Sequence, residues 1–281
     1  MPKNVSVYAL GKPASKFKYI FYFYKYIFSL RYDAVFVHMN EEYVLLGGWW
    51  WRLVGKKVVL WRNHKMGSWR TRLAARVASV VCYTSPDAFV ARYKKSVQMP
   101  VGIDTEFFMP PPVPAADTIL FLGRIDPVKK VEVFVEALGK ISSPFKVDIY
   151  GSPTDPHSAY AKALAAKVAI RPGVPHAQTR ELYQSHALYV NLTPSGSFDK
   201  TIGEAMASGC LVVCANEALR GVLPDALLCQ DTADSAAKAI EHALAMSAAE
   251  RESVVKGLRT YVEQEHSLRL LADRLPAILT Q

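Results

Sequence analysis

The chain has 281 residues, of which 51% are hydrophobic and 21% are charged, a mixture typical of globular proteins that excludes a disordered or fibrous chain. This length is sufficient for two α/β domains of ordinary size. The net charge of +9 is uneven: residues 1–110 hold 17 Lys and Arg against 6 Asp and Glu, whereas residues 111–281 hold 17 against 19. We therefore expect the first part to meet an anionic partner, such as a phospholipid surface, a polyprenyl phosphate, an acidic polysaccharide or a nucleic acid.

The cysteines and the apolar stretches bear on the compartment. The four cysteines form no CxxC pair, and three of them lie in apolar runs, which predicts buried, reduced thiols of a cytoplasmic protein and neither a disulfide framework nor a metal site. No signal peptide is visible, and the longest apolar stretch, residues 19–30, is broken by Lys25 and is too short to span a bilayer. We expect a cytoplasmic protein that is soluble or attached peripherally to the inner face of the membrane.

Apolar, β-rich runs alternate with helical patterns along the chain. Up to a proline-rich stretch at residues 109–114, the pattern predicts strands at 5–10, 34–39, 57–61 and 80–84, and helices at 16–30, 43–53 and 68–78. Beyond it, the pattern predicts strands at 118–122, 146–150, 188–192 and 211–214, and helices at 131–140, 156–167, 177–185, 203–207 and 235–246. Continuous apolar strands between helices indicate parallel sheets covered on both faces, so both halves are expected to be doubly wound, Rossmann-like domains.

The proline-rich stretch is a stiff linker with little hydrogen-bonding capacity. We place the domain boundary there, which gives domains at 1–112 and 113–281, with the last helix packing back on the first domain. In doubly wound folds, ligands lie at the carboxyl ends of the strands, and with two domains this means the cleft between them.

The first candidate motif follows the strand at 118–122. Gly123 and Arg124 form the turn, and Lys129 lies near the start of the next helix. A loop between a strand and a helix N-terminus offers backbone donors and a positive dipole to an anion. An arginine and a lysine that converge there would neutralise a diphosphate and stabilise the charge on a departing phosphate, although the same residues could form a solvated basic loop.

The second candidate motif spans residues 193–209 and again leads from a strand into a helix. Its small residues would let backbone amides approach a ligand closely. Glu204 lies in a Gly-Glu-Ala-Met-Ala run between two apolar strands, where its carboxylate could accept hydrogen bonds from paired ribose hydroxyls or simply favour the first turn of a helix. His64 follows the strand at 57–61 and is either a histidine that faces the cleft or a structural one.

Together these motifs resemble the donor-binding domain of the retaining GT-B glycosyltransferases of family 4. The family's Arg/Lys pair is matched by Arg124 and Lys129, and its Glu-Ala-Met run begins at Glu204. Residues 148–151 resemble the second strand and turn, and residues 173–176 resemble the segment beside the nucleobase. In the first half, residues 32–38, 58–64 and 99–108 resemble the family's strands and the exit from its N-terminal domain. The resemblance covers roughly residues 30 to 275.

The resemblance implies a GT-B-like α/β protein, with two Rossmann-type parallel-sheet domains that face a cleft and an abbreviated N-terminal domain. It implies retaining transfer of a hexosyl unit from a UDP- or GDP-sugar to a hydroxyl acceptor, such as a lipid-linked or cell-envelope saccharide. Arg124, Lys129 and His64 would be catalytic. The donor-binding residues would be Gly123, Gly151, Val174, Gly196, Ser197, Phe198, Asp199, Lys200, Thr201, Ile202 and Glu204. No metal ion and no cofactor other than the donor substrate is implied.

Two departures from the family leave alternatives open. The first glutamate of the family's Glu-x7-Glu element falls at Gly196, and the N-terminal domain is short. A weak or inactive sugar-nucleotide-binding relative would fit these departures, and a GT-B-like nucleotide-sugar epimerase is a second alternative. A nucleic-acid-binding protein would fit the basic half, but the sequence contains no recognised module of that kind, so we expect no nucleic-acid partner.

The run at residues 16–28 is aromatic and basic, with Lys18 and Lys25 seven residues apart on one helical face. Its aromatic side chains could lie at a bilayer interface with the lysines among anionic headgroups. Trp49, Trp50 and Trp51 next to Arg52 add a second such patch. The alternatives are a helix that packs on the sheet of the first domain, or a homodimer contact.

Overall fold

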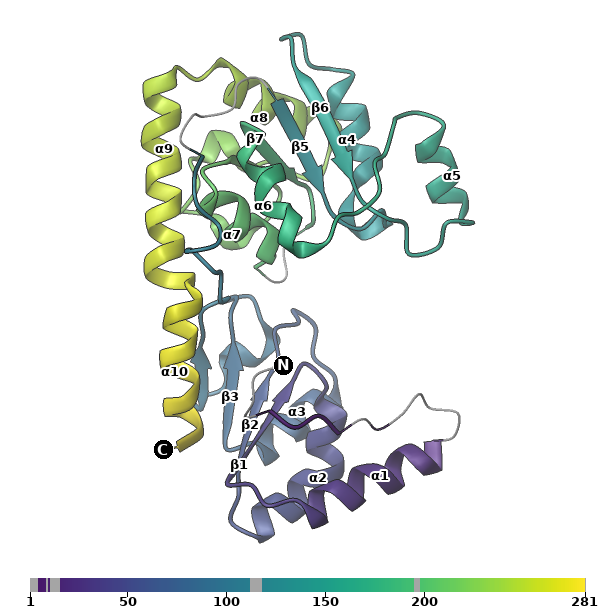
Figure 1. Cartoon of the computed structure of the whole chain (residues 1–281), viewed down its shortest axis with the longest axis vertical. Coiled ribbons are helices and arrows are strands. Elements are labelled where there is room, and N and C mark those ends of the chain that lie inside the picture. The colour runs from purple at the N-terminus through teal and green to yellow at the C-terminus, as the bar shows by residue number, and fades with distance from the viewer. Residues whose placement is uncertain (1–4, 9, 11–15, 112–117, 195–197, 281) are drawn as a thin grey trace.

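Two parallel β-sheets organise the chain in the computed structural model, which describes residues 5–8, 10, 16–111, 118–194 and 198–280. They form two lobes that stand one above the other (Figure 1). The N-terminal lobe comprises α1 (Lys16–Ser29), β1 (Ala34–His38), α2 (Glu41–Leu53), β2 (Lys57–Trp61), α3 (Trp69–Val77), β3 (Val80–Tyr83) and β4 (Ser96–Gln98). Its strands are all parallel, in the order β1-β2-β3-β4.

The local sequence explains how the N-terminal lobe is built. Four of the five β2 residues are buried, as expected of a central parallel strand with helices on its faces. Asn40 caps α2, where its side chain accepts a hydrogen bond from the Glu42 amide. Ser68 and Thr71 form a reciprocal capping box at the start of α3. These caps fix where each helix begins after its strand.

The C-terminal lobe contains the second sheet, with the strand order β6-β5-β7-β8. Its elements are β5 (Thr118–Leu122), α4 (Val131–Leu138), β6 (Lys146–Tyr150), α5 (Ala159–Ala165), α6 (His176–Gln184), β7 (Leu188–Asn191), α7 (Lys200–Ala207), β8 (Leu211–Cys214) and α8 (Ala233–Ala245). All eight residues of β7 and β8 are buried. This lobe therefore has a continuous apolar core that holds the carboxyl ends of its strands in place.

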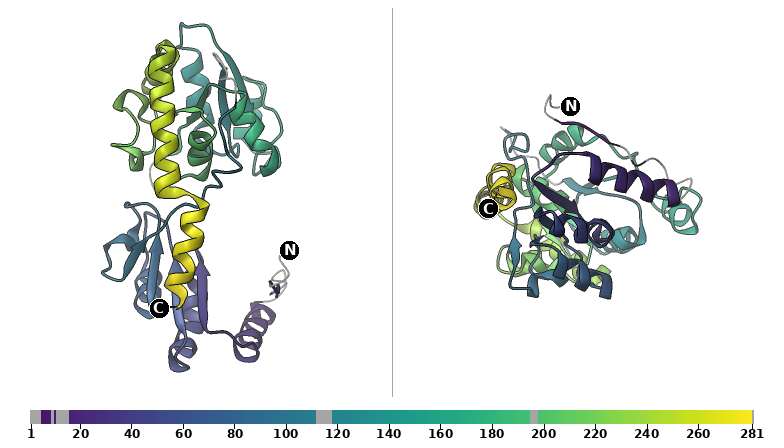
Figure 2. Two further views of the ribbon diagram at one scale, coloured as in Figure 1. Left: turned by 60° about the vertical axis from the view of Figure 1, so that its left-hand side comes forward. Right: turned by 90° about the horizontal axis from the view of Figure 1, so that it is seen from below.

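A long helical segment joins the two lobes. It consists of α9 (Ala248–Tyr261), a π-helical turn (Val262–His266) and α10 (Leu268–Thr280), and it runs past both lobes in Figure 2. Leu271, Leu275, Ile278 and Leu279 of α10 pack against a buried cluster of Val59, Trp61, Cys82 and Met99 in the N-terminal lobe. The last helix thus contributes to the core of the lobe in which the chain begins.

The structure confirms the two parallel-sheet α/β units and most of the expected elements. The strand expected at residues 5–10 is wrong, because the described residues of that stretch adopt no regular structure and Val5, Val7 and Tyr8 are 50%, 64% and 52% exposed. The helix expected at 203–207 begins three residues earlier, at Lys200. The expected linker boundary between residues 112 and 113 lies outside the described residues.

Two further expectations concern burial and the membrane. All four cysteines are buried, as expected from their apolar surroundings. Within the described part of the chain, no helix has both the length and the apolar composition needed to cross a membrane.

Candidate functional site

The strands of both sheets point toward the space between the lobes (Figure 1). The loops that follow β5, β6 and β7 therefore lie on the C-terminal side of this space, and the loops that follow β1, β2 and β3 lie opposite. Among the described residues that were predicted for the site, several lie on these loops: Gly123, Arg124, Lys129, Gly151 and His64. Val174 precedes α6, Phe198 and Asp199 lead into α7, and Lys200, Thr201, Ile202 and Glu204 lie on α7.

Gly123 and Gly151 bring the first two C-terminal loops into contact. The Gly123 amide donates to the Tyr150 carbonyl over 3.1 Å, and the Ile125 amide donates to the Ser152 carbonyl over 3.1 Å. A Cβ atom added at Gly151 would overlap the Gly123 carbonyl oxygen. Only glycine fits at position 151, and its absence of a side chain lets the two loops form one surface.

The basic pair lies on the loop after β5. Arg124 is exposed. Lys129 ends a 3₁₀ turn, Pro127–Lys129, at whose start the Asp126 side chain accepts a hydrogen bond from the Val128 amide. The Lys129 ammonium lies 2.5 Å from the Asp199 carboxylate, although 70 residues separate them in sequence. The two motifs predicted separately from the sequence therefore meet in space.

Asp199 is a charged group in a largely buried place. Burial alone would raise the pKa of its carboxyl group, but the Lys129 charge and hydrogen bonds from Lys129, Asn191 and Thr201 outweigh burial and lower it. The Asn191 amide nitrogen lies 3.2 Å from the same carboxylate oxygen. Asp199 is therefore ionised at neutral pH and paired with Lys129.

Glu204 lies on α7 with only 6% of its surface exposed. Its carboxylate is 3.1 Å from His176 Nε2 and accepts a hydrogen bond from the Tyr183 hydroxyl over 3.3 Å. Burial raises the pKa of the Glu204 carboxyl group, and the His176 and Tyr183 contacts oppose that rise. A buried carboxylate with two polar neighbours has the chemistry needed to accept hydrogen bonds from a ligand.

The remaining residues that were predicted to bind the donor differ in exposure. Lys200 is exposed, Val174 and Thr201 are half-buried, and Ile202 is fully buried in the core, so the Ile202 side chain contributes packing. Phe198 is buried against the His266 ring, with 4.6 Å between the centroids. Gly196 and Ser197 lie outside the described residues.

On the N-terminal side, His64 is exposed, and its Nδ1 atom lies 2.9 Å from the Met66 amide nitrogen. His38, which was not predicted as a site residue, ends β1, and its pKa is affected by a charge on the other lobe. Burial lowers the pKa of His38, and the positive charge of Lys200 lowers it further. The Lys200 charge therefore acts on His38 across the space between the lobes, a relation that only the strand-end position of His38 could have suggested.

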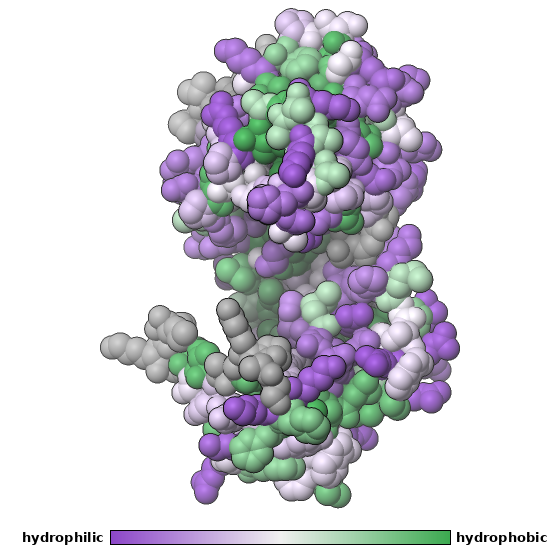
Figure 3. Space-filling view, turned by 90° about the vertical axis from the view of Figure 1, so that its right-hand side faces the viewer, coloured by the Kyte–Doolittle hydropathy of each residue, from purple (hydrophilic) through white to green (hydrophobic). Residues whose placement is uncertain are grey.

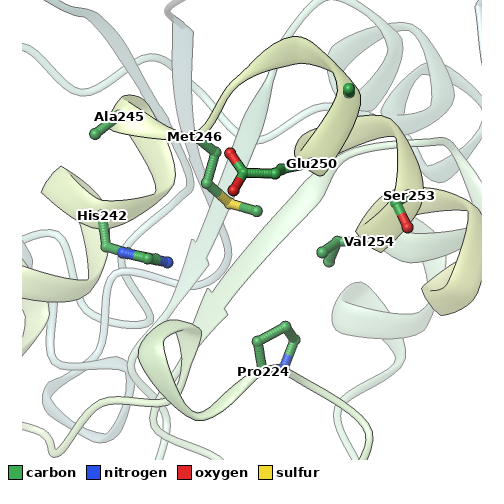
Figure 4. A pocket seen from close by; sticks show the side chains of 8 residues that line it. Pro224, His242, Ala245, Met246, Glu250, Ser253 and Val254 are labelled. Carbon is green, nitrogen blue, oxygen red and sulfur yellow. The ribbon is translucent and has the colours of Figure 1, made fainter.

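Cavities elsewhere in the C-terminal lobe involve other residues. One of about 680 Å³ lies between α8 and α9 and is lined by Pro224, His242, Met246, Glu250 and Val254 among others (Figure 4). None of these residues was predicted as a site residue. Among the described residues, no three His, Cys, Asp or Glu side chains form a group that could hold a metal ion.

Residues 116–246 match the model of the family "Glycosyl transferases group 1". The matched residues extend over most of the C-terminal lobe, from β5 to the end of α8. Among curated protein sequences, none matches the chain.

Solved structures extend the likeness to both lobes. HepE of Anabaena, solved in complex with UDP, superposes with a TM-score of 0.78 at 14% identity, over 89% of this chain and 79% of HepE. Sucrose-phosphate synthase of Thermosynechococcus elongatus gives 0.73 at 20% identity, over 93% and 76%. A glycosyltransferase of Rickettsia africae gives 0.75 at 18% identity, over 95% and 82%. The chain therefore has the two-domain GT-B fold, as its motifs predict.

Proposed function

We propose that the protein is a retaining glycosyltransferase that transfers a hexosyl unit from a UDP- or GDP-sugar to a hydroxyl group of a saccharide, without a metal ion or other cofactor. The observation that carries this proposal is the position of Glu204, a buried carboxylate at the carboxyl edge of the sheet of a group 1 domain. A nucleoside offers paired ribose hydroxyls, which such a carboxylate can bind.

Arg124 and Lys129 supply the positive charge for the diphosphate. Both follow β5, and Lys129 is held beside Asp199 at the N-terminus of α7. The amides at this helix end carry a partial positive charge. As the bond between sugar and phosphate breaks, negative charge grows on the leaving phosphate, and groups fixed in advance around it lower the barrier.

The other predicted residues would complete the donor site. Gly123, Gly151 and Val174 would form its floor, and the amides of residues 198–202 would approach the sugar and phosphates. His64 would contact the donor sugar from the N-terminal lobe. No candidate covalent nucleophile stands out among these residues, so we propose that the departing phosphate assists the attack of the acceptor on the same face of the sugar.

The surface of the N-terminal lobe supports the proposal that the acceptor is a lipid-linked or cell-envelope saccharide at the cytoplasmic face of a membrane. Phe17, Phe21 and Phe28 of α1 are 86%, 65% and 52% exposed, and Trp49 and Leu53 of α2 are 55% and 73% exposed. Figure 3 shows apolar side chains gathered on this lobe. Aromatic side chains next to lysines suit an interface with anionic headgroups. A homodimer contact is the alternative use of the same surface.

Ligand-dependent thermal stabilisation tests the proposal. UDP, GDP, ADP and their glucose conjugates are added to the wild type, Glu204→Ala and Arg124→Ala. A rise in Tm with UDP or GDP that is lost in both variants is expected, because a ligand that binds only the folded state stabilises it. If millimolar nucleotide leaves the wild-type Tm unchanged, the proposal is wrong.

Turnover separates the transferase from its alternatives. With the donor that binds, release of nucleoside diphosphate should require a saccharide acceptor, and NMR of the product should show the anomeric configuration of the donor. Acceptor-independent conversion of the nucleotide sugar would instead identify an epimerase, and binding without turnover would identify an inactive relative.

A further inference from the structure

The ion pair between Lys129 and Asp199 joins the loop after β5 to the start of α7. Lysine has a flexible four-carbon side chain and a charge that seeks water. Here the Lys129 side chain is only 17% exposed and that of Asp199 only 20%, with 2.5 Å between the ammonium nitrogen and Oδ2. Lysine ammonium groups at the rim of a cleft are commonly surrounded by water, whereas this one is partly buried and paired with a carboxylate.

Asp199 is itself fixed by a buried polar network. Asn191 Nδ2 lies 3.2 Å from Asp199 Oδ2, 3.1 Å from the Tyr189 hydroxyl and 3.3 Å from Thr201 Oγ1. The Tyr189 hydroxyl lies 2.8 Å from Thr201 Oγ1 and 3.2 Å from the Leu122 carbonyl oxygen. Tyr189 is fully buried and Asn191 is 4% exposed. The carboxylate is thus anchored to the ends of β5 and β7 and to the first turn of α7.

We infer that Asp199 is a positioning residue, and not a contact to the donor: its carboxylate holds the Lys129 ammonium against the N-terminus of α7. The inference rests on the proposed function, in which Lys129 and the α7 amides bind the same diphosphate. An ammonium has three N–H donors, so Lys129 can give one to Asp199 and keep others for phosphate oxygens. The carboxylate also cancels part of the lysine charge, which weakens binding of the diphosphate in the ground state.

These two effects predict a split between binding and turnover. Asp199→Asn removes the opposing charge, so UDP or GDP should bind as tightly as to the wild type or several-fold more tightly. The same change loosens the ammonium, so kcat should fall at least tenfold, because groups fixed before the reaction stabilise the transition state best. A residue that only bound the donor would lose affinity, and a residue that only supported the fold would lower Tm.

The experiment is a double-mutant cycle with nucleotide binding by calorimetry and initial rates. It compares wild type, Asp199→Ala, Lys129→Ala and the double variant, with Asp199→Asn as the conservative change. Since Asp199 acts through Lys129, the double variant should be no slower than Lys129→Ala alone. Asp231→Asn is the matched control, because Asp231 pairs with the adjacent Lys130 at 3.2 Å, and both its kcat and its Kd should stay within twofold of the wild type.

The outcomes separate the inference from the function on which it rests. If the wild type binds neither UDP nor GDP, the proposed function fails. If the wild type binds and turns over, but the losses from Asp199→Ala and Lys129→Ala multiply in the double variant, Asp199 acts independently of Lys129 and the inference is wrong.

A second readout does not depend on activity. In the wild type labelled with ¹⁵N-lysine, the Lys129 ammonium resonance, assigned with Lys129→Arg, should move or broaden in Asp199→Asn. An unchanged resonance would show that Asp199 does not hold the ammonium, and would overturn the inference.

Discussion

The buried carboxylate of Glu204 is expected to favour nucleotide binding and to lower the stability of the folded protein. Burial raises the pKa of its carboxyl group, so the ionised form is destabilised in the folded state. The contribution of the carboxyl group to stability is therefore fully present below its unfolded-state pKa and is lost as the pH rises through the folded-state pKa. We predict that Glu204→Gln raises Tm at pH values above the folded-state pKa. UDP affinity should fall about tenfold, since one charge-assisted hydrogen bond is worth roughly 1.5 kcal/mol.

Thermal unfolding between pH 4 and 8, together with calorimetry of UDP binding, measures both effects. Glu181→Gln on α6 is the control, because Glu181 is exposed, and it should change neither Tm nor affinity. A lower Tm for Glu204→Gln at pH 8 would mean that the contacts with His176 and Tyr183 outweigh the cost of burial.

At the level of residues, the sequence reveals what lies close together along the chain. Arg124 is a candidate because it follows an apolar strand directly, whereas Lys129 and Glu204 are candidates because they lie in the two motifs that resemble the donor-binding domain. The approach of Lys129 to Asp199 could not be predicted, because it depends on how β5 and β7 pair and on where α7 begins. The effect of the Lys200 charge on His38 depends on how the two lobes face one another, which no local pattern encodes.

The helix α10 packs against residues that lie far from it in the sequence, in the sheet of the N-terminal lobe. Leu275 is half-buried against the sheet of the N-terminal lobe. Leu275→Ala should lower the free energy of unfolding by roughly 1–2 kcal/mol, at the low end for a leucine-to-alanine change because the site is only partly buried. Hydrogen exchange should increase in α10 and in β2, while the exchange of β7 should stay unchanged.

Asp273→Ala on the exposed side of the same helix is the matched control, and it should alter neither quantity. Equal effects of the two substitutions would show that α10 contributes helical propensity alone and no packing energy to the N-terminal lobe.

The elements were predictable where burial determines the pattern. The strand at 57–61 matches β2 because a central parallel strand needs an unbroken apolar run. Residues 5–10 are also largely apolar, but their described part forms no strand. A strand must exchange hydrogen bonds with a neighbour, and among the described strands β1 pairs only with β2. At three residues, β4 is too short for a pattern to identify.

The junction of the two lobes depends on one histidine. The His266 carbonyl accepts hydrogen bonds from the Gly102 and Ile103 amides, at 3.0 and 2.8 Å. Its ring contacts Phe198 just before α7, and its Nδ1 atom accepts a hydrogen bond from the Val101 amide over 3.4 Å. Burial lowers the pKa of His266 to about 4. A proton on Nδ1 would oppose the Val101 N–H, so the junction requires the neutral ring.

The pKa of His266 predicts how the whole molecule responds to acid. Its stabilising contribution is present above the unfolded-state pKa of about 6.5 and is lost as the pH falls toward about 4, by at most about 3 kcal/mol. The Tm of the wild type should therefore fall between pH 7 and pH 5 more steeply than that of His266→Gln. The exposed His157→Gln variant should follow the wild type, and identical profiles for His266→Gln and the wild type would refute the prediction.

The position of α10 also has a consequence for how the protein is made. On the ribosome, β1 to β4 emerge first, but the side chains that cover Val59, Trp61, Cys82 and Met99 are carried by α10, which emerges after the whole C-terminal lobe. That apolar strip stays uncovered throughout synthesis, which exposes the nascent chain to aggregation and to chaperones. This face of the N-terminal lobe can therefore be covered only after translation has passed α10.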